Sequence, residues 1–243
     1  MIGKIRPSAA ASLSAVRSGA SVVIGGFGQT GVPADLIDAL CDRDVRDLHV
    51  IANNGGRGLP GERGIGRLLK EDRVRRFSCS FPINPEFFRR YFAGRVEIEL
   101  VPQGTLAERL RAGGSGLGGF FTPTAAGTLL ADGGFVVRYG EGGAAQEVLA
   151  EKESRVIDGR TYVFESPLRP DVALVKAHRA DRYGNLRFRL GARNFNPLAA
   201  MAARLTIVQA DHVERVGSLA PDDVHLPGPF VDHVVETLGE PVR

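Results

Sequence analysis

Residues 21–33 read Ser-Val-Val-Ile-Gly-Gly-Phe-Gly-Gln-Thr-Gly-Val-Pro, and they carry the clearest signal of the fold class. A short run rich in β-branched residues ends at two glycines. Pro33 then opens a helical pattern over 33–41, and proline suits the first turn of a helix. The segment therefore predicts a buried strand, a tight glycine turn and a helix, which is how a βαβ unit begins.

The same alternation of strand-like and helix-like patterns continues along the chain. Further strands are predicted at 48–52, 76–80, 96–101, 172–178, 186–190 and 205–213, and helices at 8–17, around 68–69, at 104–112 and at 196–204. Between them, 113–119 predicts a flexible glycine stretch and 134–164 predicts short strands and hairpins. We therefore expect an α/β fold with a single open, mostly parallel sheet flanked by helices, a β-hairpin excursion in the middle, and one domain over residues 1–243.

Composition excludes several classes of protein. The chain has 31 basic and 28 acidic side chains in 243 residues, a net charge of +3, which is too balanced for a protein built mainly to bind nucleic acid. No apolar run approaches the ~18 residues that span a bilayer, and Arg17 interrupts the N-terminal stretch before it forms a signal-peptide core. Neither the two cysteines nor the five histidines have metal-ligand spacing. We expect a soluble cytoplasmic protein with no metal and no nucleic-acid or membrane partner.

The glycine turn also matches a dinucleotide-binding pattern, Gly26-x-Gly28-x-x-Gly31, between a predicted strand and a predicted helix. A nicotinamide site of this type needs an acidic residue at the end of the second strand, where this chain has Asn53 and Asn54. The sequence therefore argues against a nicotinamide cofactor.

Read as a whole, the chain resembles the A (alpha) subunit of family I coenzyme A transferases, the 3-oxoacid and 3-oxoadipate CoA-transferases. The resemblance extends from about residue 10 to 235. Its motifs occur in the family's order at 22–33, 52–55, 101–114, 120–124, 173–177, 181–185 and 192–196. Two loops, 55–64 and 80–86, depart from the family pattern. Both are expected near the substrate end of the sheet, so the acyl specificity stays open.

The resemblance implies that CoA moves from succinyl-CoA to a 3-oxoacid. Residues 133–143 and 223–228 are similar to the acetoacetate branch, whereas 76–82 is more similar to 3-oxoadipate transferases. Acetoacetate is therefore the favoured acceptor and 3-oxoadipate the alternative.

In this family the thioester is attacked by a glutamate of the B subunit, which then carries a glutamyl-CoA intermediate. Glu62 and Glu141 lie in glycine-rich loops without the flanking pattern of that nucleophile. The resemblance therefore implies a partner B subunit in an A2B2 heterotetramer, a CoA thioester as substrate and no permanently bound cofactor. Because the chain lacks its own nucleophile, a non-catalytic CoA- or nucleotide-binding module is the other reading.

The residues left to this chain are hydrogen-bond donors. Backbone N–H groups at the glycine turn and side-chain amides at neighbouring strand ends are predicted to bind the reacting oxygens, since the carboxyl ends of parallel strands share one edge. The predicted substrate-binding residues are Gly25, Gly26, Phe27, Gly31, Asn53, Asn54 and Gln103. Each has a structural alternative, as a tight turn, a cap or an exposed loop amide. Residues 192–196 are expected to position a loop before the helix at Pro197.

Overall fold

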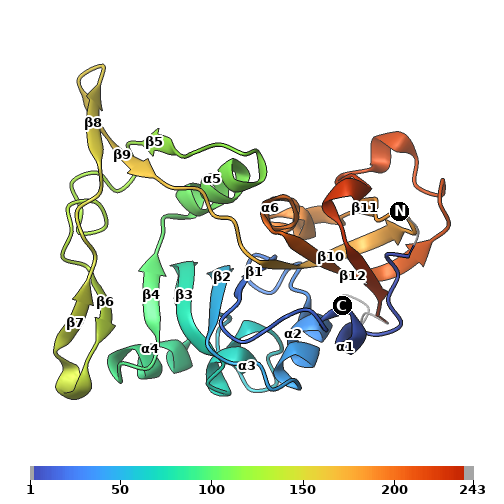
Figure 1. The fold of residues 1–243 in the computed structure, drawn as a ribbon, viewed down its shortest axis with the longest axis horizontal. Coiled ribbons are helices and arrows are strands. Elements are labelled where there is room, and N and C mark those ends of the chain that lie inside the picture. Colours follow the sequence, from blue (N-terminus) through green and yellow to red (C-terminus); the bar gives the residue numbers. More distant parts are fainter. Residues whose placement is uncertain (1–2, 238–243) are drawn as a thin grey trace.

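A parallel sheet forms the centre of the protein, which a computed structural model describes over residues 3–237 (Figure 1). The strand order is β13-β12-β10-β1-β2-β3-β4, and short β11 pairs antiparallel with β10. The strands are β1 (Ser21–Ile24), β2 (Leu48–Asn54), β3 (Val74–Phe81), β4 (Glu97–Leu100), β10 (Val172–Asp181), β11 (Leu186–Arg187), β12 (Leu205–Glu214) and β13 (His233–Glu236). The predicted open, mostly parallel sheet is confirmed.

Strand β1 lies at the point where the chain changes direction across the sheet. Val22 pairs with Val50 of β2 on one side and with Val172 of β10 on the other. The helices are α1 (Ala9–Ser12), α2 (Ala34–Cys41), α3 (Ile65–Lys70), α4 (Pro85–Phe92), α5 (Gln103–Gly114) and α6 (Asn196–Ala202). Figure 1 shows α1–α4 together below the strands and α5 and α6 above them. In an open α/β sheet such a switch point is where ligands bind, at the carboxyl ends of the strands.

Both faces of the sheet are buried. Val22 and Ile24 belong to the apolar cluster that includes α2 and α3, whereas Val23 belongs to the cluster that includes α5 and α6. Side chains of a strand alternate between the two faces, so a strand covered on both sides reads as a continuous apolar run. This is why β1 is recognisable from four residues.

Residues 120–165 form an arm beside the sheet, seen at the left of Figure 1. A three-stranded antiparallel sheet and a two-stranded hairpin build it. Its elements are β5 (Phe120–Thr122), β6 (Val136–Tyr139), η1 (Glu141–Gly143), β7 (Ala145–Val148), β8 (Ser154–Ile157) and β9 (Arg160–Glu165). The predicted β-hairpin excursion is confirmed.

Some local predictions are wrong. The helix expected at 8–17 is limited to the four residues of α1, and the strand expected at 186–190 keeps two residues before a 3₁₀ turn, η2 (Leu190–Arg193). Gly113 and Gly114 do not belong to a flexible stretch but end α5. A Cβ at Gly113 would lie 1.8 Å from the Leu168 carbonyl oxygen, so glycine is needed there for close approach rather than for mobility.

The sequence patterns did not predict helix α4, although the residues that cap its N-terminus can be recognised in the sequence. The Asn84 side chain accepts from the Glu86 N–H, and Pro85 occupies the first turn. Asparagine followed by proline is a common helix start. The comparison with the family pattern marks these residues only as part of a divergent loop.

A chain of polar contacts joins β2, β3 and β4 at one side of the sheet. His49 Nε2 lies 2.7 Å from Ser78 Oγ, Ser78 donates to Glu99, and Arg109 donates to Glu99 at 2.8 Å. Ser78 is fully buried and lies between imidazole and carboxylate. In a Ser-His-acid triad the histidine is central, so this trio ties β2, β3, β4 and α5 together and is not a nucleophile system.

His49 makes folding sensitive to mild acid. Burial lowers the pKa of His49 from 6.5 to about 4, against a smaller opposing effect of the Glu99 charge. Between these values the unfolded chain binds a proton that folded His49 does not. The contribution of His49 to the free energy of unfolding is therefore fully present above about pH 6.5. It decreases toward pH 4, by up to about 1.4 kcal/mol per pH unit. We expect urea midpoints to fall between pH 7 and pH 5, and His49→Gln to flatten that fall.

The exposed His212 provides the control, because His212→Gln should leave the slope as in the wild type. An unchanged slope in His49→Gln would assign the acid sensitivity to another group.

Candidate active site

A small pocket lies between the carboxyl ends of β1 and β2. It is lined by backbone of the glycine turn, by Asn53 and Asn54, and by Val32, Arg63 and Ile65. Its cavity volume is about 10 Å³, which holds roughly one water-sized group. Only one or two atoms of a ligand fit inside, so the rest of a ligand lies outside the pocket.

The fold already uses two of the three predicted backbone donors. Gly25 N–H donates to the Leu174 carbonyl at 2.9 Å, and Phe27 N–H donates to the Thr30 carbonyl at 3.0 Å. The prediction that these two N–H groups are free donors is therefore wrong, because one extends the β1–β10 ladder and the other closes the turn. Gly26 N–H makes no hydrogen bond to any residue in 3–237, and Gly26 lines the pocket.

Asn196 holds the glycine turn in place. Its side chain is fully buried, accepts from Lys176 N–H at 3.0 Å, and donates to the carbonyls of Gly31 at 3.0 Å and Ala192 at 2.9 Å. A Cβ at Gly25 would lie 1.9 Å from Asn196 Oδ1, and one at Gly31 would lie 2.7 Å from the Ala192 carbonyl oxygen. Both glycines are thus required by the space that Asn196 and its loop occupy. The expectation that 192–196 positions a loop is confirmed.

Asn53 and Gln103 come together although 50 positions separate them. Gln103, the first residue of α5, donates its Nε2 to Asn53 Oδ1 at 2.7 Å. Asn53 is 4% exposed, whereas Gln103 is exposed. The bond orients the Asn53 amide, and its Nδ2 donates to no residue in 3–237.

Asn54 also lines the pocket, from the next position on β2. Its Oδ1 accepts from Gly56 N–H at 3.0 Å, which closes a tight turn after the strand. Within the part of the chain that the structure describes, Asn54 Nδ2 has no hydrogen-bond partner. The predicted turn role and the predicted donor role are therefore compatible, since they use different atoms of one amide.

Sequence comparison decides the family. The pattern that defines the family described as Coenzyme A transferase matches residues 6–237. The chain belongs to the coenzyme A transferase family. This confirms the resemblance inferred from the motifs.

Relatives of this transferase chain carry two kinds of name. It is 46% identical to the A subunit of the 3-oxoadipate CoA-transferase of Pseudomonas putida, over 98% of this chain and 96% of the relative. It is 47% identical to the A subunit of a probable succinyl-CoA:3-ketoacid coenzyme A transferase of Mycobacterium bovis, over 96% and 93%. An acyl-CoA transferase of Escherichia coli O157:H7 shares the fold, with a TM-score of 0.82 at 23% identity. The match covers 98% of this chain but only 48% of that one.

The divergent loop 55–64 of this transferase chain is ordered by Glu62. Its carboxylate accepts from the N–H groups of Arg57 at 2.8 Å and Leu59 at 2.9 Å, and from the Gln29 side-chain amide of the glycine turn. Glu62 is therefore engaged in holding two loops together. The motif comparison, which sets Glu62 aside as a nucleophile, gives no signal for this role.

The two divergent loops of the transferase chain also contact each other. Asn84 is almost fully buried and donates its Nδ2 to the Gly55 carbonyl at 2.8 Å. The departures at 55–64 and 80–86 therefore form one connected wall beside the pocket. Sequence reasoning missed this link because the two segments are far apart in the chain.

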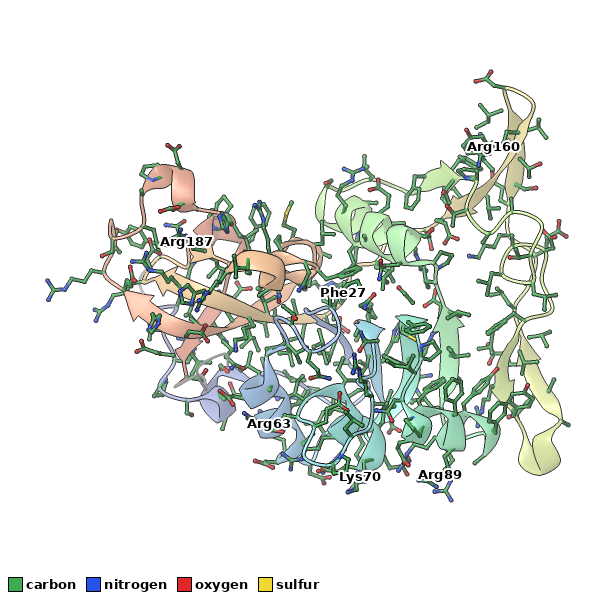
Figure 2. The ribbon with its side chains drawn as sticks, turned by 180° about the vertical axis from the view of Figure 1, so that it is seen from behind. Phe27, Arg63, Lys70, Arg89, Arg160 and Arg187 are labelled. Carbon is green, nitrogen blue, oxygen red and sulfur yellow. The ribbon has the colours of Figure 1, made fainter. Side chains whose placement is uncertain are left out.

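Several large apolar side chains of this transferase chain are exposed. They include Phe27 of the glycine turn, which Figure 2 labels, and Phe81, the last residue of β3. The exposed fractions are 49% for Phe27, 58% for Leu59, 61% for Phe81 and 86% for Leu190.

Over residues 3–237, the transferase chain shows neither a membrane-spanning helix nor a cluster of metal-ligating side chains. None of its helices combines the length and hydropathy of a bilayer-spanning segment. Over the same residues, no three His, Cys, Asp or Glu side chains gather in an arrangement suited to a metal ion.

Proposed function

We propose that this chain is the A subunit of a heteromeric CoA-transferase that moves CoA from succinyl-CoA to a 3-oxoacid, acetoacetate first. The observation that carries the proposal is the one-atom pocket at the β1–β2 edge, lined by Gly26, Asn53 and Asn54, in a chain of this family. 3-Oxoadipate is the second candidate acceptor, because relatives with either name are nearly equally similar, at 47% and 46%.

The pocket suits an oxygen that gains negative charge. When a carboxylate attacks a thioester, the carbonyl oxygen becomes an oxyanion, and preorganised donors stabilise it. In the proposed site the donors are Asn53 Nδ2, Asn54 Nδ2 and Gly26 N–H. The pocket admits little more than that oxygen, so the donors do not have to reorganise around water.

The nucleophile is proposed to come from a B subunit. Its glutamate attacks the acyl-CoA carbonyl and expels the CoA thiolate, leaving an acyl-glutamyl anhydride. The thiolate then attacks the glutamyl carbonyl and releases the acid, which leaves glutamyl-CoA, and the acceptor acid reverses both steps. The occupied carboxylate of Glu62, in a loop beside the pocket, supports a nucleophile from outside this chain. We propose an A2B2 assembly with no permanently bound cofactor.

The proposal of a two-chain enzyme predicts activity only in the mixture. The purified chain alone should not transfer CoA from succinyl-CoA to acetoacetate, and adding the B chain should restore turnover with ping-pong kinetics. The assay follows acetoacetyl-CoA absorbance and is repeated with 3-oxoadipate. A B chain whose nucleophilic glutamate is changed to alanine is the matched control.

Turnover by the isolated chain would contradict the two-chain enzyme. CoA binding without turnover in the mixture would favour the non-catalytic module, and a higher kcat/KM for 3-oxoadipate would replace acetoacetate as the acceptor.

A further inference from the structure

A second cavity lies at the far end of β10, on the opposite side of the glycine turn from β2. Its volume is about 350 Å³. It shares no lining residue with the small pocket between β1 and β2, which contains Asn53 and Asn54 and which we call the amide pocket. It is lined by His178, Arg187, Phe188, Arg189, Leu190 and His225, and we call it the basic cleft. Its chemistry differs from that of the amide pocket, because it combines guanidinium and imidazole groups.

Each imidazole of the basic cleft has one nitrogen engaged by the protein. His178 Nδ1 lies 3.2 Å from Asp211 Oδ2, and His225 Nδ1 accepts the Phe188 N–H at 3.1 Å. Accepting that hydrogen bond places the hydrogen of neutral His225 on Nε2. Burial lowers the pKa of His225, and the nearby charges of Arg193 and Arg187 lower it further. His225 therefore offers a neutral N–H donor in a positive environment.

The guanidinium groups of the cleft are poorly neutralised. Arg187 lies 3.4 Å from Asp223, but both side chains are more than one third exposed, so the pair is weak. Arg189 and Arg193 form no ion pair with any residue in 3–237. Arginine binds phosphate oxygens through paired N–H donors, so this excess of charge suits a phosphate group. Figure 2 shows Arg187 in the lobe formed by the C-terminal part of the chain.

The basic cleft is physically joined to the glycine turn. Asn194 donates its Nδ2 to the carbonyls of Thr30 at 3.0 Å and Gly191 at 2.8 Å, which holds the loop after β11 against the turn. His178 is four residues beyond Leu174, whose carbonyl accepts from Gly25 N–H. At ~3.3 Å per strand residue, that is about 13 Å along β10. An extended pantetheine arm is longer than this.

We propose that the basic cleft binds the phosphate groups of the CoA thioester while its acyl carbonyl occupies the amide pocket. The inference rests on the proposed transferase function. Arg187 and Arg189 donate to phosphate oxygens, and His225 Nε2–H donates at the cleft wall, where its ring is stacked on Phe188 with centroids 6.2 Å apart. The loop at 189–194 links the two sites, so binding at one end helps to orient the other.

The first test uses the assembled transferase and the variant Arg189→Gln. We expect the KM for succinyl-CoA to rise about 10-fold at unchanged kcat, in the range for losing one charge-assisted hydrogen bond. Kinetics with succinyl-pantetheine, which has no phosphate, should not change. The matched control is Arg160→Gln, an exposed arginine on the arm (Figure 2), which should leave both substrates unaffected. Equal losses with both substrates would overturn the proposal, and so would equal effects of the two variants.

The second test measures binding to the full purified chain by calorimetry, with adenosine 3′,5′-bisphosphate as the probe. Arg189→Gln should weaken binding of the probe about 10-fold. Inorganic phosphate should compete poorly with the probe if the cleft recognises the nucleotide. Equally good competition by phosphate would assign the cleft to free phosphate and overturn the CoA assignment. If the mixture with B is inactive yet the probe binds the wild type and not the variant, the result contradicts the proposed transferase function and supports the phosphate site. If turnover is normal and the variant changes no KM, the result contradicts the phosphate site and supports the transferase function.

Discussion

Replacement of Gly25 by alanine is expected to destabilise the chain by about 3–5 kcal/mol and to remove most transferase activity. The new Cβ would lie 1.9 Å from Asn196 Oδ1, which already accepts from Lys176 N–H. Asn196 is fully buried and cannot swing away without breaking its bonds to Gly31 and Ala192. The glycine turn that shapes the amide pocket would move with it. Thermal unfolding should show a Tm lower by roughly 10 °C for a chain of this size.

Gly118→Ala is the matched control, because a Cβ there meets nothing within 4 Å. A double variant, Gly25→Ala with Asn196→Ala, tests the cause. If the clash is responsible, the double variant is less destabilised than the sum of the single variants. Additive losses, or a Gly25→Ala variant as stable as the wild type, would show that Asn196 does not constrain the turn.

Asn53→Ala is expected to lower kcat/KM of the assembled enzyme by about 10²–10³-fold, the range for removing one oxyanion donor. The glutamyl-CoA intermediate on the partner should form more slowly, since the lost interaction belongs to the transition state that precedes it. Folding should be little changed, because Asn53 lies at the end of β2, outside the apolar clusters. Rapid-quench measurement of the intermediate separates this effect from weaker substrate binding.

Gln103 variants show whether that residue positions Asn53 or acts as a donor itself. If Gln103 only holds Asn53 Oδ1, Gln103→Ala should cost about 10-fold, less than Asn53→Ala, because Asn53 Nδ2 is still present but less well oriented. Gln103→Glu should be worse than alanine, since a carboxylate cannot donate to Asn53 Oδ1. Wild-type rates of intermediate formation in both Asn53→Ala and Gln103→Ala would make the two amides structural.

The strands and helices nearest β1 were predictable because their signals are local. The run at 21–24 followed by glycines, and the asparagines that end β2, follow from side-chain periodicity and turn chemistry. Shorter or irregular elements were not predictable in this way. Helix α1 spans only four residues, and the expected strand at 186–190 turns into η2, after which Asn194 donates to the Thr30 carbonyl of a distant segment.

Local sequence patterns were enough to predict the strand–turn–helix order, the family and the edge of the sheet at which Gly26, Asn53, Asn54 and Gln103 lie. These follow from patterns within about a dozen residues and from the rule that parallel strands end at one edge. Which hydrogen-bond donors remain free depends on contacts between distant segments. Gly25 N–H is taken by Leu174, Gln103 is bonded to Asn53 across 50 positions, and Asn196 reaches Gly31 across 165. A hydrogen bond between distant segments depends on how the layers pack, and no local pattern encodes it.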